Sequence, residues 1–427
     1  MELPVKNHKR GLWTLSPLLV FFLIYVITSV VAGDFYKMPV TVAFMAASAW
    51  AFVVSKPARL GLRIERFSKG AANANIMMMV WIFILAGAFA GAAKFIGSVD
   101  STVNLTLSVL PPNMIPAGIF IAACLISLSI GTSVGTIVAL MPVAAGVATS
   151  SGLPLPLMAG IVVGGAFFGD NLSFISDTTI AATRTQGCLM RDKFRANFRI
   201  VIPAALLVLV VYIILGWQYA APVEVGAIAW SRVIPYLLVL ITALCGVNVM
   251  LVLILGILST GLLSLCSSEL SLLAWAGAMG KGMTDMGELI IVTLLAGGML
   301  ELIRYNGGIQ YVIRILSSRV RTRRGAELTI STAVAIANLC TANNTVAIVT
   351  VGDISRRISE CFGIPPQRAA SLLDTTSCVI QGLIPYGAQL LMGASLAAIS
   401  ALDIIPYLYY NFALALSCLL FILFKRG

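Results

Sequence analysis

The chain has 427 residues, of which 59% are hydrophobic and only 11% are charged, and its mean hydropathy is +0.99. A soluble globular domain is excluded, because so few charged side chains cannot cover so much apolar surface. Apolar runs of about 20 residues, the length that crosses a hydrocarbon layer of roughly 30 Å, recur along the whole sequence. The chain is therefore predicted to cross a membrane many times.

The formal net charge of +11 does not indicate nucleic-acid binding, because the Lys and Arg residues are not gathered in one polar domain. They lie in short segments between apolar runs, which is the positive-inside pattern of cytoplasmic loops. The pattern predicts that the N- and C-termini are both cytoplasmic. The basic segments are 6–10, 56–69, 184–199, 304–324, 356–368 and 425–426.

Apolar runs and the polar breaks between them define the predicted membrane segments. The first lacks a convincing small-residue cleavage site, so it is predicted to be a retained helix and not a signal peptide. Two short segments, 134–150 and 343–355, begin at breaks containing Gly or Asn, and each fits either a full crossing or one arm of a re-entrant hairpin. In chain order the segments are 14–32, 38–54, 75–97, 114–130, 134–150, 154–183, 198–216, 232–246, 247–266, 286–304, 326–341, 343–355, 366–400 and 404–424.

Cysteine and histidine usage argues against a resident metal or redox centre. The eight cysteines form no C-x-x-C pair, and most lie within apolar runs, where they are predicted to be small buried residues. The one histidine, His8, precedes the first helix, so a histidine proton relay inside the membrane is excluded. No nucleotide-binding loop is present, and no cofactor is predicted beyond a transported ion.

Three pairs of segments resemble each other at a spacing of about 210 residues, close to half the chain. One match could be chance among so many Ala, Gly and Leu residues, but three in the same order predict an internal repeat with halves at 1–217 and 218–427. The positive-inside pattern places the halves in opposite orientations, as in many secondary transporters. The predicted fold is an all-α polytopic membrane protein of inverted repeats, with broken helices and re-entrant hairpins. The matching segments are 85–97 with 295–307, 131–136 with 341–345, and 169–176 with 380–387.

The densest polar patch interrupts the apolar segment 154–183. Asp170 and Asp177 are seven residues apart, which on a continuous helix places them on one face. Gly169 and the serines would let the helix unwind and expose backbone carbonyls. Carboxylate, hydroxyl and carbonyl oxygens suit hard cations such as Na⁺, and an intramembrane Asp is a common proton carrier. An alternative is that Asp177 begins a cytoplasmic loop. The candidate ligands are Asp170, Asn171, Ser173, Ser176, Asp177 and Thr178, with the two aspartates as the Na⁺ ligands.

Two further patches lie at the starts of the short segments. Thr132 and Ser133 follow a glycine and supply neutral oxygens, although small residues also form helix-packing faces in membranes. Asn343, Asn344 and Thr345 offer amide and hydroxyl groups, which could bind a solute or form hydrogen bonds between helices.

A fourth patch extends from Asp374 to Gln381 and Pro385. Pro385 removes a backbone donor and kinks the helix, which frees carbonyls near Gln381. The repeat places Gln381 opposite Asp170, so one half has a neutral side chain where the other has a charge. Asp374 lies nearer the cytoplasmic start of its segment, and solvation is its alternative role.

The stretch 169–179, with the sequence GDNLSFISDTT, resembles the NhaC-type Na⁺/H⁺ antiporter family of the ion transporter superfamily, as does the stretch 373–386. The resemblance covers most of the chain and implies an exchanger of the bacterial inner membrane, with two re-entrant hairpins whose tips meet broken helices. It also implies ion or substrate binding by Asp170, Ser173, Ser176, Asp177 and Thr178. The sequence departs from the family pattern after the first Asp, where Asn stands in place of Lys, and after Ser173, where Phe stands in place of Pro.

The leading hypothesis is Na⁺/H⁺ antiport by alternating access, in which Na⁺ and protons compete for Asp170. One alternative is a Na⁺- or H⁺-coupled carrier of a small carboxylate or amino acid. Another is a membrane-embedded aspartyl protease that uses Asp170 and Asp177. The expected partners are the lipid bilayer and a small ion or solute. The oligomeric state is open, with a homodimer as one alternative.

Overall fold

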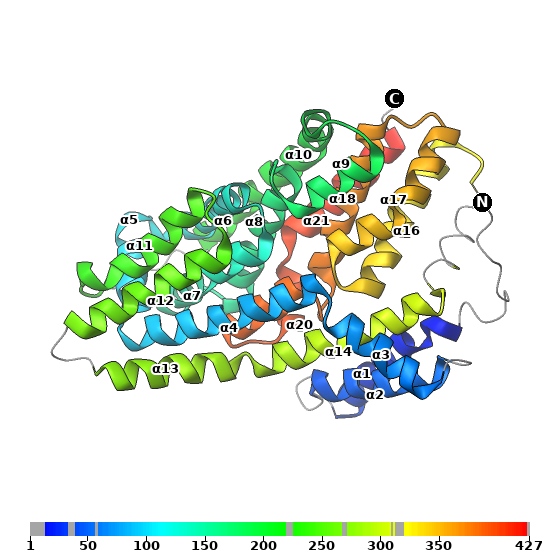
Figure 1. Ribbon diagram of the computed structural model, residues 1–427. Coiled ribbons are helices and arrows are strands. Elements are labelled where there is room, and N and C mark those ends of the chain that lie inside the picture. Colours follow the sequence, from blue (N-terminus) through cyan, green and yellow to red (C-terminus); the bar gives the residue numbers. More distant parts are fainter. Residues whose placement is uncertain are drawn as a thin grey trace.

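The computed structural model describes residues 13–32, 39–55, 59–218, 225–266, 271–308, 311 and 320–424, and these residues form helices and no strand (Figure 1). His8 and the basic segments 6–10 and 425–426 lie outside the described residues. The first half contains η2 (Trp13–Leu15), α1 (Ser16–Ala32), α2 (Val40–Val54), α3 (Leu60–Ala71), α4 (Ala74–Phe95), α5 (Ser98–Val109), η3 (Pro112–Met114), α6 (Ile115–Ile130), α7 (Ser133–Ser151), α8 (Leu155–Leu172), α9 (Asp177–Gln186) and α10 (Met190–Gln218). The second half contains α11 (Trp230–Leu244), α12 (Val249–Cys266), α13 (Leu272–Asp285), α14 (Gly287–Tyr305), α16 (Arg323–Thr341), α17 (Asn344–Cys361), α18 (Pro366–Leu383), α19 (Ala388–Ala397), α20 (Ala401–Ile404), η4 (Ile405–Tyr407) and α21 (Tyr409–Phe424).

Eight helical segments of the described chain are long and apolar enough to cross a membrane, and a ninth forms if the bent pair 401–407 and 409–424 is one span. At a rise of 1.5 Å per residue, the 19 residues of α7 extend about 28 Å, close to the thickness of the hydrocarbon layer. The predicted all-α polytopic class is confirmed. Three described helices were not predicted as segments, namely α3, α5 and α13.

The two halves contact each other where α13 packs against α4 and where α3 packs against α14 (Figure 1). A Cβ atom added to Gly87 on α4 would overlap the carbonyl of Gly282 on α13. A Cβ atom on Gly70 of α3 would likewise overlap Gly297 on α14. Backbones approach this closely in membranes only where side chains are absent or very small. Each half therefore packs a short helix against the long helix of the other half.

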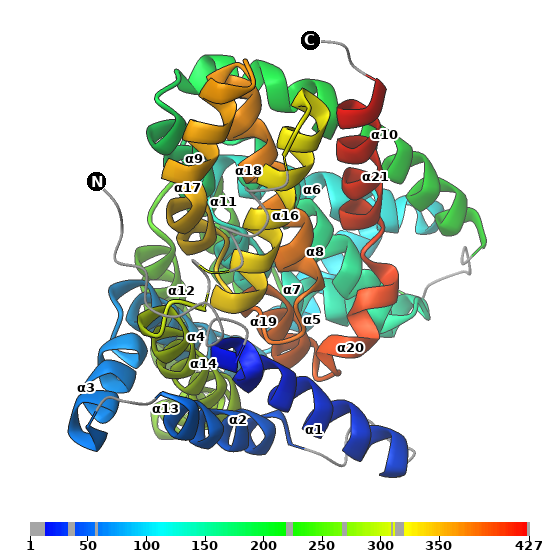
Figure 2. The same ribbon diagram turned by 90° about the vertical axis from the view of Figure 1, so that its right-hand side faces the viewer.

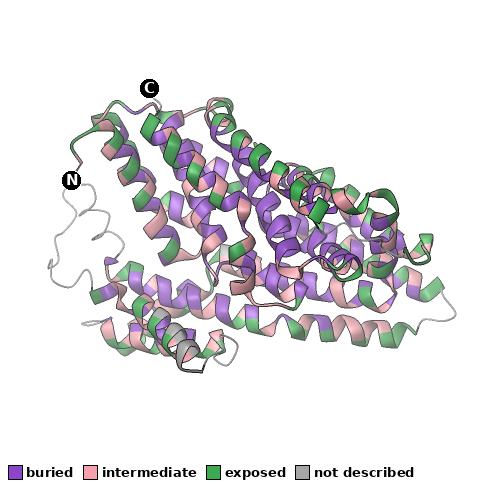
Figure 3. Ribbon diagram, turned by 180° about the vertical axis from the view of Figure 1, so that it is seen from behind, coloured by how far each residue is buried: buried purple, intermediate pink, exposed green. Residues whose placement is uncertain are grey.

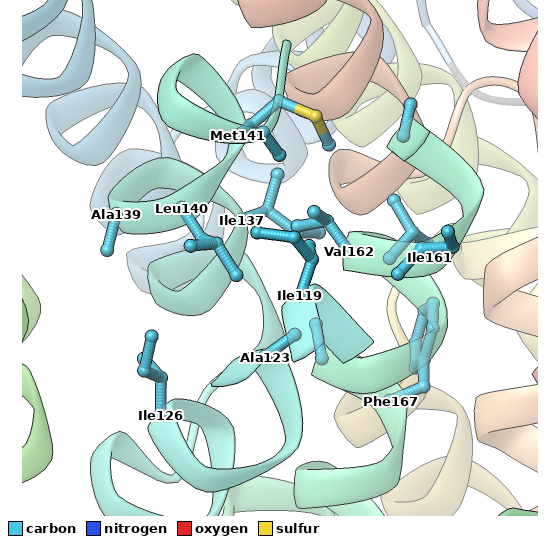
Figure 4. Close-up of a cluster of buried hydrophobic side chains, with 14 of the residues drawn as sticks. Ile119, Ala123, Ile126, Ile137, Ala139, Leu140, Met141, Ile161, Val162 and Phe167 are labelled. Atoms are coloured by element: carbon cyan, nitrogen blue, oxygen red, sulfur yellow. The ribbon is translucent and has the colours of Figure 1, made fainter. Parts of the chain in front are cut away.

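Helices α6, α7 and α8 form the hydrophobic interior of the first half, where Ile119, Ile137, Ile161 and Phe167 lie together (Figure 4). Every residue of α8 from Leu157 to Leu172 is buried. Seen from behind, buried residues concentrate in the helices at the middle of the molecule, while exposed ones lie at its edges (Figure 3). Because α8 is surrounded by protein on all sides, its polar C-terminal end lies in the interior and not at the surface.

Equivalent hydrogen bonds occur in the two halves at one spacing. The hydroxyl of Ser127 donates to the carbonyl of Ala166 at 2.5 Å, and the amide of Asn338 donates to the carbonyl of Ser377 at 2.7 Å. Asn338 lies 211 residues after Ser127, and Ser377 lies 211 residues after Ala166. Helices α16 and α18 therefore contact each other as α6 and α8 do. The boundary between halves at 217 and 218 stays a prediction.

Candidate functional site

Two helices are interrupted inside the protein, at 173–176 between α8 and α9 and at 384–387 between α18 and α19. The first interruption lies where Gly169 and the serines predict unwinding. The predicted placement of Asp170 and Asp177 on one face of a continuous helix is wrong. The helix ends at Leu172 and a new helix begins at Asp177.

Hydroxyl groups satisfy the carbonyls that this interruption leaves without helical partners. The carbonyl of Asp170 accepts hydrogen bonds from the hydroxyls of Ser176 at 2.7 Å and Thr178 at 3.3 Å. Ser176 also caps α9, because its hydroxyl accepts from the backbone N–H of Thr179 at 3.2 Å. Serine and threonine therefore stabilise a break that would otherwise leave unpaired polar groups at membrane depth.

The turn between α6 and α7 meets this break at the Asp170 side chain. Gly131 has a φ of 74°, a left-handed conformation that glycine adopts without steric cost, and Thr132 is extended. Helix α7 then begins at Ser133, whose backbone N–H donates to Asp170 Oδ1 at 3.0 Å. The carboxylate thus lies at a helix N-terminus, where the partial positive charge of the helix stabilises an anion.

The second half contains an equivalent contact between a turn and a broken helix. Here the side chain of the broken helix donates the hydrogen bond and the backbone of the turn accepts it. Ala342 has a φ of 47° at the turn between α16 and α17, and its carbonyl accepts from Gln381 Nε2 at 3.0 Å. Gln381 Nε2 also donates to Gln389 Oε1 at 2.9 Å, and Gln389 Nε2 donates to the Ser133 hydroxyl at 3.0 Å. A chain of neutral hydrogen bonds therefore connects the turn of one half to the turn of the other.

A cavity of about 530 Å³ lies where the two turns and the first break converge. It is lined by residues of both halves, and its exposed lining residues include the charged Asp177 and Arg184. Of the thirteen candidate residues, eight line this cavity: Thr132, Ser133, Asp170, Asp177, Thr178, Asn343, Asn344 and Thr345. The other lining residues were not among the candidates, and three of these have polar or charged side chains: Arg184, Thr185 and Gln389.

The five other candidates lie behind the cavity wall. The hydroxyl of Ser173 donates to the carbonyl of Leu128 at 3.0 Å, so Ser173 fixes the break against α6. Ser176 and Gln381 hold the two breaks, as described above. Asn171 and Asp374 belong to a buried polar network. Because the Asp374 side chain is completely buried, its alternative role as a solvated residue is wrong.

Lys193 and Asn197 of α10, which sequence reasoning missed, complete this network. The ammonium of Lys193 lies 2.8 Å from Asp374 Oδ2 and donates to the carbonyl of Asn171 at 3.0 Å and to the hydroxyl of Thr179 at 2.6 Å. Asn197 Nδ2 donates to Asp374 Oδ2 and to the carbonyl of Asn171, both at 2.7 Å. The network therefore joins α8, α9, α10 and α18 beside the first break.

The spacing between Lys193 and the apolar residues that follow it could have indicated that Lys193 lies on the buried face of a helix. Residues Lys193, Asn197, Ile200 and Ala204 recur every three or four positions and are buried, whereas Arg191, Arg195 and Arg199 are exposed. This is the period of one helix face. The high density of positive charge from 184 to 199 led instead to the prediction of a cytoplasmic loop.

The two buried aspartates near the breaks, Asp170 and Asp374, differ in whether a basic side chain forms an ion pair with them. Asp374 is paired with Lys193, whereas Asp170 forms no ion pair with any residue that the structure describes. The neutral side chains of Thr132, Thr178 and Asn344 line the same cavity as Asp170, together with the charged side chains of Asp177 and Arg184. Asp170 is thus a carboxylate without an ion-pair partner among the described residues, at a cavity whose lining combines apolar side chains with several hydroxyl and amide groups.

A second cavity, of about 280 Å³, lies beside the other break and is lined by Pro385 and Tyr386. Residues 288, 289 and 292 of α14 line this second cavity, and residues 78, 79 and 82 of α4 line the first cavity. Each of the three α14 positions lies 210 residues after the corresponding α4 position. Helix α19 contributes Gln389 to the first cavity and Leu391 to the second. Each broken helix therefore has a hollow next to it, bounded by equivalent parts of the repeat (Figure 2 shows α19 beside α7 and α4).

Broken membrane helices that meet helix turns around an uncompensated carboxylate are typical of secondary transporters, and this chain is one. The comparison of its sequence with known families gives the particular group. The chain belongs to the Na⁺/H⁺ antiporter family, whose model matches residues 9–217 and 221–426. The resemblance of the sequence to Na⁺/H⁺ antiporters is therefore confirmed.

Relatives of this chain include carriers of ions and of organic acids. It is 26% identical to the Na⁺/H⁺ antiporter NhaC of Bacillus subtilis, over 82% of this chain and 84% of that protein. It is 29% identical to the malate-2H⁺/Na⁺-lactate antiporter of the same organism, over 38% of this chain and 36% of that protein. Among solved structures, the YdaH transporter of Alcanivorax borkumensis is similar with a TM-score of 0.42 and 14% identity, over 84% of this chain and 86% of that one.

Proposed function

We propose that this protein exchanges Na⁺ for protons and that Asp170 is the residue for which the two cations compete. The observation that supports this most directly is the state of the Asp170 carboxylate. It lines a cavity to which Thr132, Thr178 and Asn344 also contribute, it accepts a hydrogen bond from the backbone N–H of Ser133, and it forms no ion pair with a basic side chain of the described residues. Hard cations favour carboxylate, hydroxyl and amide oxygens as ligands. A buried carboxylate without a basic ion-pair partner favours protonation when no cation is bound.

Competition at one carboxylate is sufficient for exchange. A Na⁺ ion and a proton each neutralise Asp170, so the occupied site has the same net charge with either cation. When Na⁺ arrives, the proton leaves, and the reverse occurs on the other side of the membrane. Asp177 is exposed at the same cavity, and we assign it to attracting cations toward Asp170 and not to holding them.

Alternating access would use the two cavities in turn. The first cavity reaches Asp170 directly, and the second lies on the other side of α19 beside the break that contains Pro385. The hydrogen bonds from Gln381 to Gln389 and from Gln389 to Ser133 connect the breaks, so movement of α19 would alter both cavities. We place the protein in a bacterial cytoplasmic membrane with both termini inside, and we assign it no enzymatic reaction.

A second candidate function is exchange of a small carboxylate or amino acid coupled to Na⁺ or protons. The volume of the first cavity favours it, because about 530 Å³ lies within the usual range for small-molecule sites and far exceeds the volume of one ion. The cavity also contains Arg184, a residue suited to a carboxylate, and the N-terminal ends of α7 and α17. The relative that exchanges malate and lactate is compatible with this candidate.

The test is transport by purified protein in liposomes that contain a pH-sensitive dye. A Na⁺ jump should change the internal pH with the wild type and not with Asp170→Asn. Asp100→Asn is the matched control, since Asp100 lies exposed on α5 away from the cavity, and it should behave as the wild type.

Two outcomes would contradict the proposal. If Asp170→Asn retained pH-dependent Na⁺ exchange, Asp170 would not be the exchange site. If the wild type responded to neither Na⁺ nor Li⁺ but accumulated malate, lactate or arginine, the second candidate function would replace the first.

A further inference from the structure

Lys193 has surroundings that are unusual for a lysine. Its side chain is only 1% exposed, and the nearest atoms to its ammonium are a carboxylate oxygen of Asp374, the carbonyl oxygen of Asn171 and the hydroxyl oxygen of Thr179. The three distances lie between 2.6 and 3.0 Å. Carboxylate, backbone carbonyl and hydroxyl oxygens are the ligands that proteins use for hard cations. The ammonium therefore stands where a metal cation could stand.

The surrounding atoms contain more acceptors than donors. Asp374 Oδ1 and Asn197 Oδ1, on side chains of the same polar network, are buried, and neither has a hydrogen-bond partner in the described structure. Asn171 also lies at the C-terminal end of α8, where helix carbonyls give a partial negative charge. A buried excess of oxygen atoms disfavours an empty site and favours a positive charge in it.

This oxygen-rich site borders the candidate ion site. Asn171 follows Asp170 directly in the chain, and the hydroxyl of Thr179 lies 3.5 Å from the carbonyl of Asp170. The atoms that surround the Lys193 ammonium and the Asp170 carboxylate therefore belong to one helix break.

We propose that Lys193 is a tethered cation that occupies a second monovalent-cation site, formed by Asp374, Asn171 and Thr179. The tether leaves Asp170 as the one site where a free cation is exchanged. Loss of the ammonium should open the second site to Na⁺. A merely structural ion pair makes a different prediction, because its loss would destabilise the protein equally in Na⁺ and in any other salt.

The experiment measures binding of ²²Na⁺ and thermal unfolding of purified protein in detergent, in NaCl or in choline chloride. Asp170→Asn removes the first site and is the reference. Asp170→Asn/Lys193→Ala should bind one more Na⁺ per chain than the reference, and Na⁺ should raise its melting temperature. Adding Asp374→Asn should abolish both effects. Asp170→Asn/Arg195→Ala is the matched control, since Arg195 is an exposed cation on the same helix.

The proposal is wrong if Asp170→Asn/Lys193→Ala binds no additional Na⁺, whether it folds equally in both salts or in neither. Lys193→Met in the same background retains most of the volume of the lysine stem, and it provides a second variant should a cavity prevent folding. Folding of either variant in NaCl but not in choline chloride would support the proposal.

The consequence for transport rests on the proposed function. With Asp170 intact, Lys193→Ala should raise the Hill coefficient for Na⁺ from about 1 toward about 2, the number of sites. If the wild type does not exchange Na⁺ but the Lys193 variants bind it, the proposed function fails and this inference stands. If exchange depends on Asp170 but the Lys193 variants bind no additional Na⁺, only this inference fails.

Discussion

A buried ion pair between α16 and α18 permits a quantitative prediction about the second half. Arg368 donates from Nε to Glu327 Oε1 and from Nη2 to Glu327 Oε2, both at 2.5 Å. Both residues are buried. The guanidinium also donates to the carbonyl of Phe421 at 3.2 Å and lies 4.3 Å from the centre of that ring. Arg368 thus ties α18 to both α16 and α21.

The two single substitutions should differ in magnitude because the remaining partners differ. Removal of one member of a buried pair costs about 3–5 kcal/mol, since the other charge is left uncompensated. After Arg368→Met, Glu327 retains Arg323, whose Nε lies 3.9 Å from Oε1, so the loss should be near the lower limit, about 3 kcal/mol. After Glu327→Gln, the guanidinium retains mainly one carbonyl and a ring, and the loss should approach about 5 kcal/mol.

The double variant Glu327→Gln/Arg368→Met should recover most of this stability, because neither buried charge remains. The measurement is unfolding of the purified protein by sodium dodecyl sulfate in mixed micelles. The matched control is the pair Arg356 and Glu360, which has a distance of 3.0 Å but is 55% and 65% exposed. Its removal should change the unfolding free energy by less than about 0.5 kcal/mol.

Two results would refute this reasoning. Losses below about 1 kcal/mol for both single variants would mean that the pair is solvated and not buried. A double variant as unstable as the sum of the single variants would mean that the two residues act independently and not as a pair.

Three further predictions concern the turns and breaks of the site. Gly169→Ala should reduce the yield of monodisperse protein in size-exclusion chromatography, because a Cβ would overlap α6, whereas Gly61→Ala, which has open space, should not. An unchanged yield of Gly169→Ala would show that the crossing of α6 and α8 can widen. Ser176→Ala should lower the unfolding free energy by about 1 kcal/mol through loss of the cap of α9, and it should weaken Na⁺ activation of transport; no effect on either would contradict the role of the cap. Ala342→Gly should stabilise the protein by about 1 kcal/mol in the same unfolding assay, because alanine is strained at a φ of 47°, and destabilisation would contradict this.

The fold could be predicted largely from apolar runs, since a bilayer requires long apolar helices and few other structures satisfy the backbone there. The helices that sequence reasoning missed are those with weaker signals. Helix α3 carries several charged residues, and α5 is short and rich in Ser and Thr. Helix α13 is held against α4 by contacts between small residues, and composition alone does not indicate such contacts.

The candidate site could be predicted in part because polar groups at membrane depth are conspicuous in an apolar sequence. The internal repeat also brought Gln381 into correspondence with Asp170. The role of Lys193 could not be predicted in the same way. A buried lysine requires a partner, and its partner Asp374 is 181 residues away in the chain, so only the folded structure reveals the pair.

The repeat also explains why one of the two central carboxylates is compensated and the other is not. Position 163, which corresponds to Asp374 at the spacing of 211 residues, is valine, and Gln381 corresponds to Asp170. Each half therefore supplies one acidic residue, at different depths of its broken helix. Lys193 comes from the first half and neutralises the acidic residue of the second. Because this pair is complete within the chain, Asp170 is the one of these two carboxylates without an ion-pair partner among the described residues, and it is the residue proposed to exchange cations.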